Sequence, residues 1–247
     1  SKSTTRLMFS YGLGDAGTGL VATQFGFFLF KFFISAGLPV IIAGSLLMLI
    51  KIWDAVNDPL IGWLSDRTKS RWGPRIPWMI AASVPLGFSL AAIWWTPAGS
   101  VLTKTIYYAI ISIVVMTAYT SINLPFAALS TEISEKTSIR TRLNASRFTG
   151  SIIAGLTGLI IAGVVLGSEG SANNEYFLMG KISGCIAVAA TLISCWGLAP
   201  FAKKARKPSG KVEAITLQFK RIFRNKKFLK VITLYILLWC ALQLMQT

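Results

Sequence analysis

The chain has 247 residues, of which 53% are hydrophobic and only 14% are charged, so it is too apolar for an ordinary soluble domain of this length. Its net charge of +16 would suit a nucleic-acid-binding protein, but its 25 Lys and Arg gather in short stretches between long apolar runs, as membrane loops require. Histidine is absent, which excludes a histidine-based zinc site, a Ser-His-Asp triad and a histidine proton relay within this sequence. No nucleophile–base pair is evident either, so we expect a membrane protein that is not an enzyme and binds no nucleic acid.

Six apolar segments are long enough to cross a bilayer, which takes roughly 20 residues. In chain order they are residues 7–33, 40–65, 77–95, 106–129, 148–166 and 182–201. A seventh apolar segment stops at the chain end, which suggests an incomplete chain. We therefore predict an all-α membrane protein in three parts. These are a six-helix transmembrane bundle at 1–202, a basic linker with an amphipathic helix at 203–227, and the start of a seventh span at 228–247.

Positive charges set the expected orientation, because Lys and Arg accumulate on cytoplasmic loops. One set of loops carries little beyond Lys31, Lys104 and Lys181. The opposite, basic set comprises Lys2, Arg6, Arg67, Lys69, Arg71, Arg75, Lys136, Arg140, Arg142 and the run 203–230. We predict a multi-pass protein of the plasma (inner) membrane with a cytoplasmic N-terminus and a cytoplasmic 203–227 linker, whose amphipathic helix contacts membrane lipid.

Two further patterns concern packing. Ala154, Gly158 and Ala162 recur every four residues in the fifth span, which lets a neighbouring helix approach closely. Trp94 and Trp95 end the third span and Trp72 and Trp78 lie near its start, so the two pairs fit the aromatic belts at the two membrane interfaces.

The second span contains a polar cluster of Lys51, Asp54, Asn57 and Asp58, in a position where ionisable side chains are costly and usually functional. Asp54 and Asp58 are four residues apart, so they stack on one helix face about 6 Å apart. Two carboxylates this close repel each other, and Lys51 offsets only one charge, so the cluster predicts a site for one Na⁺, Li⁺ or H⁺. The alternative is an internal ion pair between Lys51 and Asp54 that only orients the bundle.

The loop after this span carries Asp66 among spaced basic residues that include Arg71 and Arg75. It resembles the signature loop that joins the second and third helices in the major facilitator superfamily. Asp66 is expected to pair with Arg71 or Arg75 and so to form a gate on the cytoplasmic side. The alternative is a set of charges that only fixes the topology, and the two roles are compatible.

Three segments resemble the glycoside-pentoside-hexuronide:cation symporters, the melibiose permease-like family of that superfamily: SYGLG at 10–14, WDAVNDP at 53–59 and RTRLNASR at 140–147. The resemblance covers essentially the whole chain. It implies the N-terminal six-helix bundle of the major facilitator superfamily fold plus the start of the seventh helix. It also implies a monomeric carrier that transports a sugar or glycoside by alternating access, with a coupling cation (Na⁺, Li⁺ or H⁺) and no other cofactor. The coupling-cation site of the family corresponds here to Asp54, Asn57, Asp58 and Thr120.

Sugar recognition is where the chain departs from this family. Gly19, Asn123 and Ala127 stand where relatives carry two sugar-binding aspartates and a tryptophan, so Gly19 and Ala127 open space and remove polarity. Asp15, one helical turn before Gly19, is expected either to replace the missing acceptor or to pair with Arg147, whose family counterpart lines the sugar site. A local hydrogen bond near the helix start is the alternative for Asp15. Two further functions therefore stay open: a carrier of a lipid-like or other organic solute, and an assembly factor that keeps the fold without transport.

Overall fold

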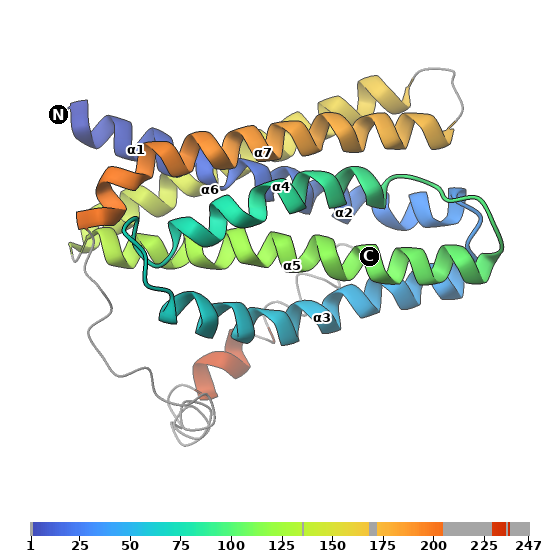
Figure 1. Cartoon of the computed structure of the whole chain (residues 1–247), viewed down its shortest axis with the longest axis horizontal. Coiled ribbons are helices and arrows are strands. Elements are labelled where there is room, and N and C mark those ends of the chain that lie inside the picture. Colours follow the sequence, from blue (N-terminus) through green and yellow to red (C-terminus); the bar gives the residue numbers. More distant parts are fainter. Residues whose placement is uncertain (1, 135, 168–171, 205–228, 236, 238–247) are drawn as a thin grey trace. The chain divides into compact units, whose positions relative to one another are not determined.

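The computed structural model describes residues 2–134, 136–167, 172–204, 229–235 and 237, and these residues are helical apart from short connections (Figure 1). The helices are α1 (Lys2–Gly14), α2 (Ala16–Ser35), α3 (Val40–Arg67), α4 (Ile76–Ile93), α5 (Val101–Ile133), α6 (Thr137–Leu166) and α7 (Ala172–Lys204). The chain divides into two units, Ser1–Pro208 and Ser209–Thr247. The first unit contains all seven of these helices.

Within the described residues, six spans are long and apolar enough to cross a membrane, which confirms the predicted six-helix membrane bundle. They are Thr5–Ser35, Val40–Arg67, Ile76–Ile93, Val101–Ile133, Thr137–Leu166 and Asn174–Lys203. Several run past their predicted ends, and α6 begins at Thr137 although its apolar part was expected to begin at 148. Hydropathy marks the part of a helix that can lie in hydrocarbon, whereas backbone hydrogen bonds continue through polar residues beyond it.

The first span is not one continuous helix. α1 ends at Gly14 and α2 begins at Ala16, with a turn at Asp15 whose carbonyl still accepts from Gly19 N at 2.8 Å. Glycines are poor helix formers, and Gly12, Gly14 and Gly17 surround this break. Close packing requires a glycine at position 14, because a Cβ there would lie 2.6 Å from Ser194 Oγ of α7. Asp15 is 6% exposed, so its side chain lies inside the bundle at this turn.

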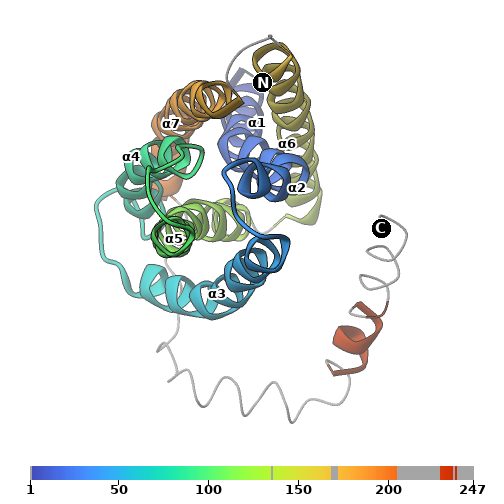
Figure 2. The same ribbon diagram turned by 90° about the vertical axis from the view of Figure 1, so that its right-hand side faces the viewer.

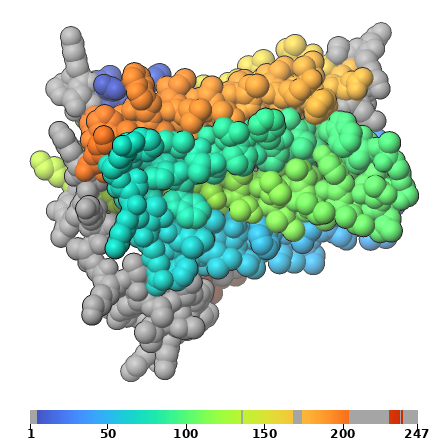
Figure 3. Space-filling model, viewed as in Figure 1, coloured from blue at the N-terminus to red at the C-terminus, as the bar shows by residue number. Residues whose placement is uncertain are grey.

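The helices pack side by side in pairs. Seen along their axes in Figure 2, α4 lies beside α7 and α5, α3 lies beside α5, and α6 lies beside α1 and α2. Figure 3 shows the face on which α7, α4 and α5 run next to one another. One buried cluster gathers around Phe32, Tyr108 and Tyr176, and a second gathers around Tyr11 and Phe126. The two clusters together form the core of the bundle.

Trp94 does not belong to an interfacial aromatic belt, so that expectation is wrong for this residue. Its side chain is 0% exposed, and its ring stacks on Tyr176 with a centroid distance of 5.7 Å. Trp95 is exposed, as expected for a belt residue. The two neighbours point in different directions because α4 ends at Ile93, which turns one ring inward against α2 and α7 and the other outward.

α6 crosses α1 and α2 very closely, through residues without side chains. A Cβ at Gly150 would lie 2.7 Å from the carbonyl carbon of Gly12 and still closer to its oxygen. A Cβ at Gly155 would lie 2.6 Å from Thr23 Oγ1. The predicted small-residue positions Ala154, Gly158 and Ala162 are buried, which confirms that this face of the fifth span packs against a neighbouring helix.

The connections between the helices fall at two ends of this unit. The N-terminal end of α1, the α3–α4 and α5–α6 connections and the end of α7 lie at one end, and the α2–α3 and α4–α5 connections lie at the other (Figure 1). The loops predicted to be basic therefore share one end, called the basic end below. Which side of the membrane it faces is still a prediction.

Part of the predicted organisation falls outside the described residues. Of the linker at 203–227, residues 203 and 204 complete α7, and 205–227 lie outside them. Of the predicted seventh span at 228–247, residues 229–235 and 237 are described, and they are helical.

Candidate functional site

The four residues predicted to bind a cation come together where α3 packs against α5. These residues, Asp54, Asn57, Asp58 and Thr120, are called the cation cluster below. Asn57 is 3% exposed, Asp54 is half-buried and Asp58 is exposed, so the two carboxylates lie at the edge of the buried face of α3. Thr120 Oγ1 of α5 donates a hydrogen bond to Asp54 Oδ1 at 3.4 Å. The Asp58 carboxylate interacts electrostatically with the Asp54 carboxylate and also with the Thr120 hydroxyl. The α5 hydroxyl thus contacts Asp54 and lies near enough to Asp58 to interact with it.

The hydrogen bonds that Thr120 and Asn57 donate use few of the cluster's oxygen atoms. The 3.4 Å contact from Thr120 is long for a hydrogen bond, so Asp54 is held only weakly by the protein. Asn57 Nδ2 donates to the Met116 carbonyl at 3.5 Å, so this contact uses the amide nitrogen and not the amide oxygen. Carboxylate, hydroxyl and amide oxygens are the ligands that hard cations prefer. Within the described ranges, Asp54 and Asp58 belong to no group of three or more acidic, Cys or His side chains.

Lys51 does not close the site. It is exposed, and among the ion pairs of the described residues none joins it to Asp54 or Asp58. The alternative of an internal Lys51–Asp54 pair is therefore not what the structure contains. α3 is instead fixed against α5 one turn away, where Trp53 Nε1 donates to Thr117 Oγ1 at 2.9 Å.

A second polar cluster, called the Arg147 cluster below, joins three of the predicted substrate residues, Asp15, Asn123 and Arg147. Arg147 of α6 contacts Asp15 through Nε and Oδ2 at 3.1 Å and donates from Nη2 to Asn123 Oδ1 at 2.8 Å. The first contact joins two charges without hydrogen-bond alignment, because the Nε atom has no hydrogen-bond partner. The other Asp15 oxygen accepts from Thr18 Oγ1 at 2.9 Å. Both alternatives for Asp15, pairing with Arg147 and bonding locally, are therefore present at once.

Aromatic residues position this cluster. The Arg147 guanidinium lies 5.5 Å from the centroid of the Phe126 ring, which stacks on Tyr11 at 4.4 Å. The Tyr11 hydroxyl donates to the Phe126 carbonyl at 3.0 Å. Tyr119 of α5 is within electrostatic reach of Asp15 and Arg147 and also of Asp54 and Asp58. The two clusters are thus neighbours along one stretch of α5.

Gly19 does not open space in this cluster, so that interpretation is wrong. A Cβ at this position would lie 2.5 Å from Ser151 Oγ and 2.9 Å from the Ser151 Cα of α6. The glycine is required for the close crossing of α2 and α6, and it cannot contact a solute there. Ala127 is half-buried on α5 one turn after Asn123, where its small side chain is compatible with either solute class.

The predicted gate residues are only partly together. Arg75 Nη2 contacts Asp66 Oδ1 at 2.5 Å, whereas Arg71 is exposed and lies over the Trp72 ring, 5.0 Å from its centroid. Arg75 Nε also contacts Glu132 Oε1 of α5 at 2.8 Å, and Nη1 donates to Ser65 Oγ at 2.8 Å. The Arg75 cluster (Ser65, Asp66, Arg75 and Glu132) therefore joins α3, the start of α4 and the end of α5.

Sequence reasoning missed Glu132, Phe126 and Tyr119. Glu132 lies three residues beyond the predicted end of the fourth span, where hydropathy places it in a loop. An isolated acid next to a long apolar segment is the signal that could have found it. Phe126 and Tyr119 look like ordinary residues of a span, and only the contacts of Phe126 with Tyr11 and Arg147 and the electrostatic interactions of Tyr119 with both clusters distinguish them.

Comparison with known proteins gives a consistent result. The sequence model of a family described as "MFS/sugar transport protein" matches residues 10–247. The chain is 37% identical over 212 residues to the uncharacterized symporter sll1374 of Synechocystis sp., which covers 83% of the chain and 38% of that protein. It is 33% identical over 164 residues to the putative glycoside/cation symporter YagG of Escherichia coli, which covers 66% of the chain and 35% of that protein.

A third relative is named for a different solute. The sodium-dependent lysophosphatidylcholine symporter 1 of Xenopus tropicalis is 28% identical over 161 residues, which covers 64% of the chain and 31% of that protein. In each of these three alignments the chain spans less than two fifths of the relative's length.

Proposed function

Because the chain belongs to the MFS/sugar transport protein family, we propose that it forms part of a secondary active transporter that couples a cation to the movement of an organic solute. The family and the symporters among its relatives indicate a transporter and not an enzyme. The observation that carries the proposal is that Asp54 and Asp58 of α3 lie next to Thr120 of α5. One turn further along α5, Asn123 contacts Arg147.

The cation is held by oxygen atoms of Asp54, Asp58, Asn57 and Thr120. Na⁺ or Li⁺ supplies the positive charge that two close carboxylates lack, and a proton on one carboxylate would do the same. Glycoside/cation and sodium-dependent symporters among the relatives support a coupling cation. Lys51 is exposed beside the site, where it lowers the local negative potential without occupying the cation position.

The solute we propose is a sugar or glycoside. Arg147, Asn123 and Asp15 present guanidinium, amide and carboxylate groups together, and such groups match the alternating donors and acceptors of sugar hydroxyls. The relative named as a putative glycoside/cation symporter supports this class. A lysophospholipid is the second candidate, favoured by the lysophosphatidylcholine symporters among the relatives and by Ala127 in place of a larger side chain.

Cation and solute are coupled through α5. Thr120 of the cation cluster and Asn123 of the Arg147 cluster are three residues apart, about one helical turn, so a shift of α5 that improves one site changes the other. Cation binding removes repulsion between α3 carboxylates, draws Thr120 toward them and raises solute affinity. The loaded carrier then reorients between the two membrane faces, and the Arg75 cluster must separate on one of them.

Membrane placement completes the proposal. The basic end of the bundle, with the N-terminus and the linker, faces the cytoplasm because Lys and Arg stay on that side. The protein works as a monomer in the plasma (inner) membrane, with lipid around it and with a second bundle that supplies the other wall of the solute cavity.

The test uses the full-length protein in proteoliposomes and measures uptake of radiolabelled solutes against Na⁺ and H⁺ gradients. Asp58→Asn keeps the size of the side chain and removes its charge, so we expect cation-driven accumulation to fall at least tenfold while solute exchange without a gradient continues. Thr120→Val and Thr120→Ser form a matched pair, of which only Ser keeps the hydroxyl and should keep coupling. Unchanged accumulation by Asp58→Asn would remove the cation assignment. A panel of glycosides and lysophosphatidylcholine separates the two solute classes.

A further inference from the structure

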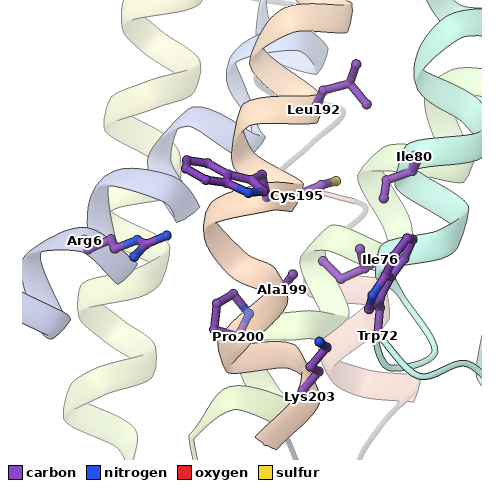
Figure 4. A pocket seen from close by; sticks show the side chains of 10 residues that line it. Arg6, Trp72, Ile76, Ile80, Leu192, Cys195, Ala199, Pro200 and Lys203 are labelled. Atoms are coloured by element: carbon purple, nitrogen blue, oxygen red, sulfur yellow. The ribbon is translucent and has the colours of Figure 1, made fainter.

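A groove at the basic end of the bundle belongs to neither of the clusters described above. It has a volume of about 620 Å³ and lies between α1, α4 and α7 (Figure 4). Its apolar walls come from Trp72 and Ile80 on one side and from Leu192 and Trp196 of α7 on the other. None of its lining residues takes part in the cation cluster, the Arg147 cluster or the Arg75 cluster.

Two cationic side chains border this apolar groove. Arg6 comes from α1 and Lys203 from the end of α7, and both are exposed. The Arg6 guanidinium lies 5.7 Å from the centroid of the Trp196 ring. Within the helices of the first unit, neither cation forms an ion pair with an acidic side chain. Among the described residues, the groove therefore combines two positive charges that no acidic side chain neutralises with a wall that water hydrates poorly.

Its position matches the boundary of a bilayer. Both cations belong to the end that gathers the basic loops, and α7 residues from Lys203 to Leu192 run from that end toward the middle of the sixth span (Figure 4). The Trp196 side chain is 76% exposed, as is common where an indole meets lipid near the headgroups. Charge lies at the headgroup level, and apolar surface continues into the hydrocarbon.

We propose that this groove binds one anionic phospholipid, with its phosphate between Arg6 and Lys203 and an acyl chain along Trp196, Leu192 and Ile80. A lipid with a single phosphate diester and an uncharged headgroup, such as phosphatidylglycerol, supplies one full negative charge to the two cations. A zwitterionic lipid of the same chain length fills the apolar part equally well, but its own ammonium group competes with Arg6 and Lys203 for the phosphate.

The chain's own linker is a poor occupant of the groove. Residues 205–228 contain eight Lys and Arg and one Glu, a net charge of +7 (8 − 1). Two exposed cations repel such a segment. Free phosphate would satisfy the charges but leave the tryptophan wall in contact with water, which is unfavourable for apolar surface of this size.

The experiment measures lipid binding, so it is independent of transport. The full-length protein in detergent is titrated with palmitoyl-oleoyl phosphatidylglycerol or with palmitoyl-oleoyl phosphatidylcholine, and bound lipid is counted by native mass spectrometry. Each basic residue near a headgroup contributes about fivefold in affinity, so we expect phosphatidylglycerol to bind about 25-fold more tightly than phosphatidylcholine. The double variant Arg6→Gln, Lys203→Gln should bind both lipids alike.

Two controls keep the result interpretable. The double variant Lys69→Gln, Lys136→Gln removes the same charge from exposed positions of the basic end outside the groove and should keep the 25-fold preference. Ala199→Trp fills the groove without changing its charges and should release both lipids. Equal binding of the two lipids by the unmodified protein would overturn the proposal. So would equal losses in the two double variants, or a groove filled by the linker so that neither lipid binds.

Discussion

Replacing Gly150 with alanine should destabilise the bundle, although it adds only one methyl group. The new Cβ would lie 2.7 Å from the carbonyl carbon of Gly12 and closer to its oxygen, whereas ordinary contacts of this kind begin near 3.4 Å. Both partners are backbone atoms of helices, so no side chain can rotate away. α1 and α6 must therefore move apart, by about 1 Å.

The size of the effect follows from what this separation does. Overpacking of a tight core costs about 1–3 kcal/mol, and here the same movement also weakens the contact between Gly155 and Thr23 further along the crossing. Alanine recovers about 1 kcal/mol through its better helix propensity. We expect a net loss of about 1 kcal/mol, which lowers the melting temperature by on the order of 3 °C.

The same helix offers a matched control. A Cβ at Gly163 would meet no atom within 4 Å, so Gly163→Ala should leave the melting temperature unchanged or raise it slightly. The assay is the loss of the monodisperse peak in size-exclusion chromatography after heating the full-length protein in detergent. If the two variants melted together, the close crossing of α1 and α6 at Gly12 would be refuted.

Two other predictions concern single arginines. Arg75→Gln leaves Glu132, which is 10% exposed, without its cation, so the free energy of unfolding should fall by about 3–5 kcal/mol in thermal melting. Glu132→Gln should partly restore it, and Arg71→Gln, at an exposed position, should change little. An equal effect of Arg75→Gln and Arg71→Gln would contradict the role given to Arg75. Arg147→Lys keeps the charge but not the two separate contacts to Asp15 and Asn123, so the half-saturating solute concentration should rise about tenfold. Cation binding in the absence of solute, measured by isothermal titration, should be retained. An equal rise in the half-saturating solute concentration and in the cation dissociation constant would contradict a role specific to the solute.

The sequence was sufficient for features that depend on local spacing. A bilayer demands a long apolar segment for each span, so hydropathy predicted all six spans. The four-residue spacing of Asp54 and Asp58 was enough to place them on one face of their span, because helix geometry alone decides this. The family resemblance added Thr120, which spacing within one helix cannot supply.

Features that depend on a distant partner were not predictable in this way. Trp94 looked interfacial, because nothing near it in the sequence shows that Tyr176 stacks on its ring. Gly19 looked like an opening in a cavity, because Ser151, which closes that space, lies on another helix. Glu132 was overlooked for the same reason, since its partner Arg75 is 57 residues away.

The Arg75 cluster is asymmetric in its access to water. The Asp66 side chain is 41% exposed and that of Glu132 is 10% exposed, although both contact the same guanidinium. A carboxylate that is already hydrated can leave its partner at little cost, whereas one that is dry cannot. In the transport cycle proposed above, we therefore expect α3 to detach first when this end opens, while α4 and α5 move together. Spin labels on the three helices would then report one changing distance and one constant distance. Arg75 would then keep α4 attached to α5 through Glu132 during opening. The same side chain would bind Asp66 again when α3 returns and the end closes.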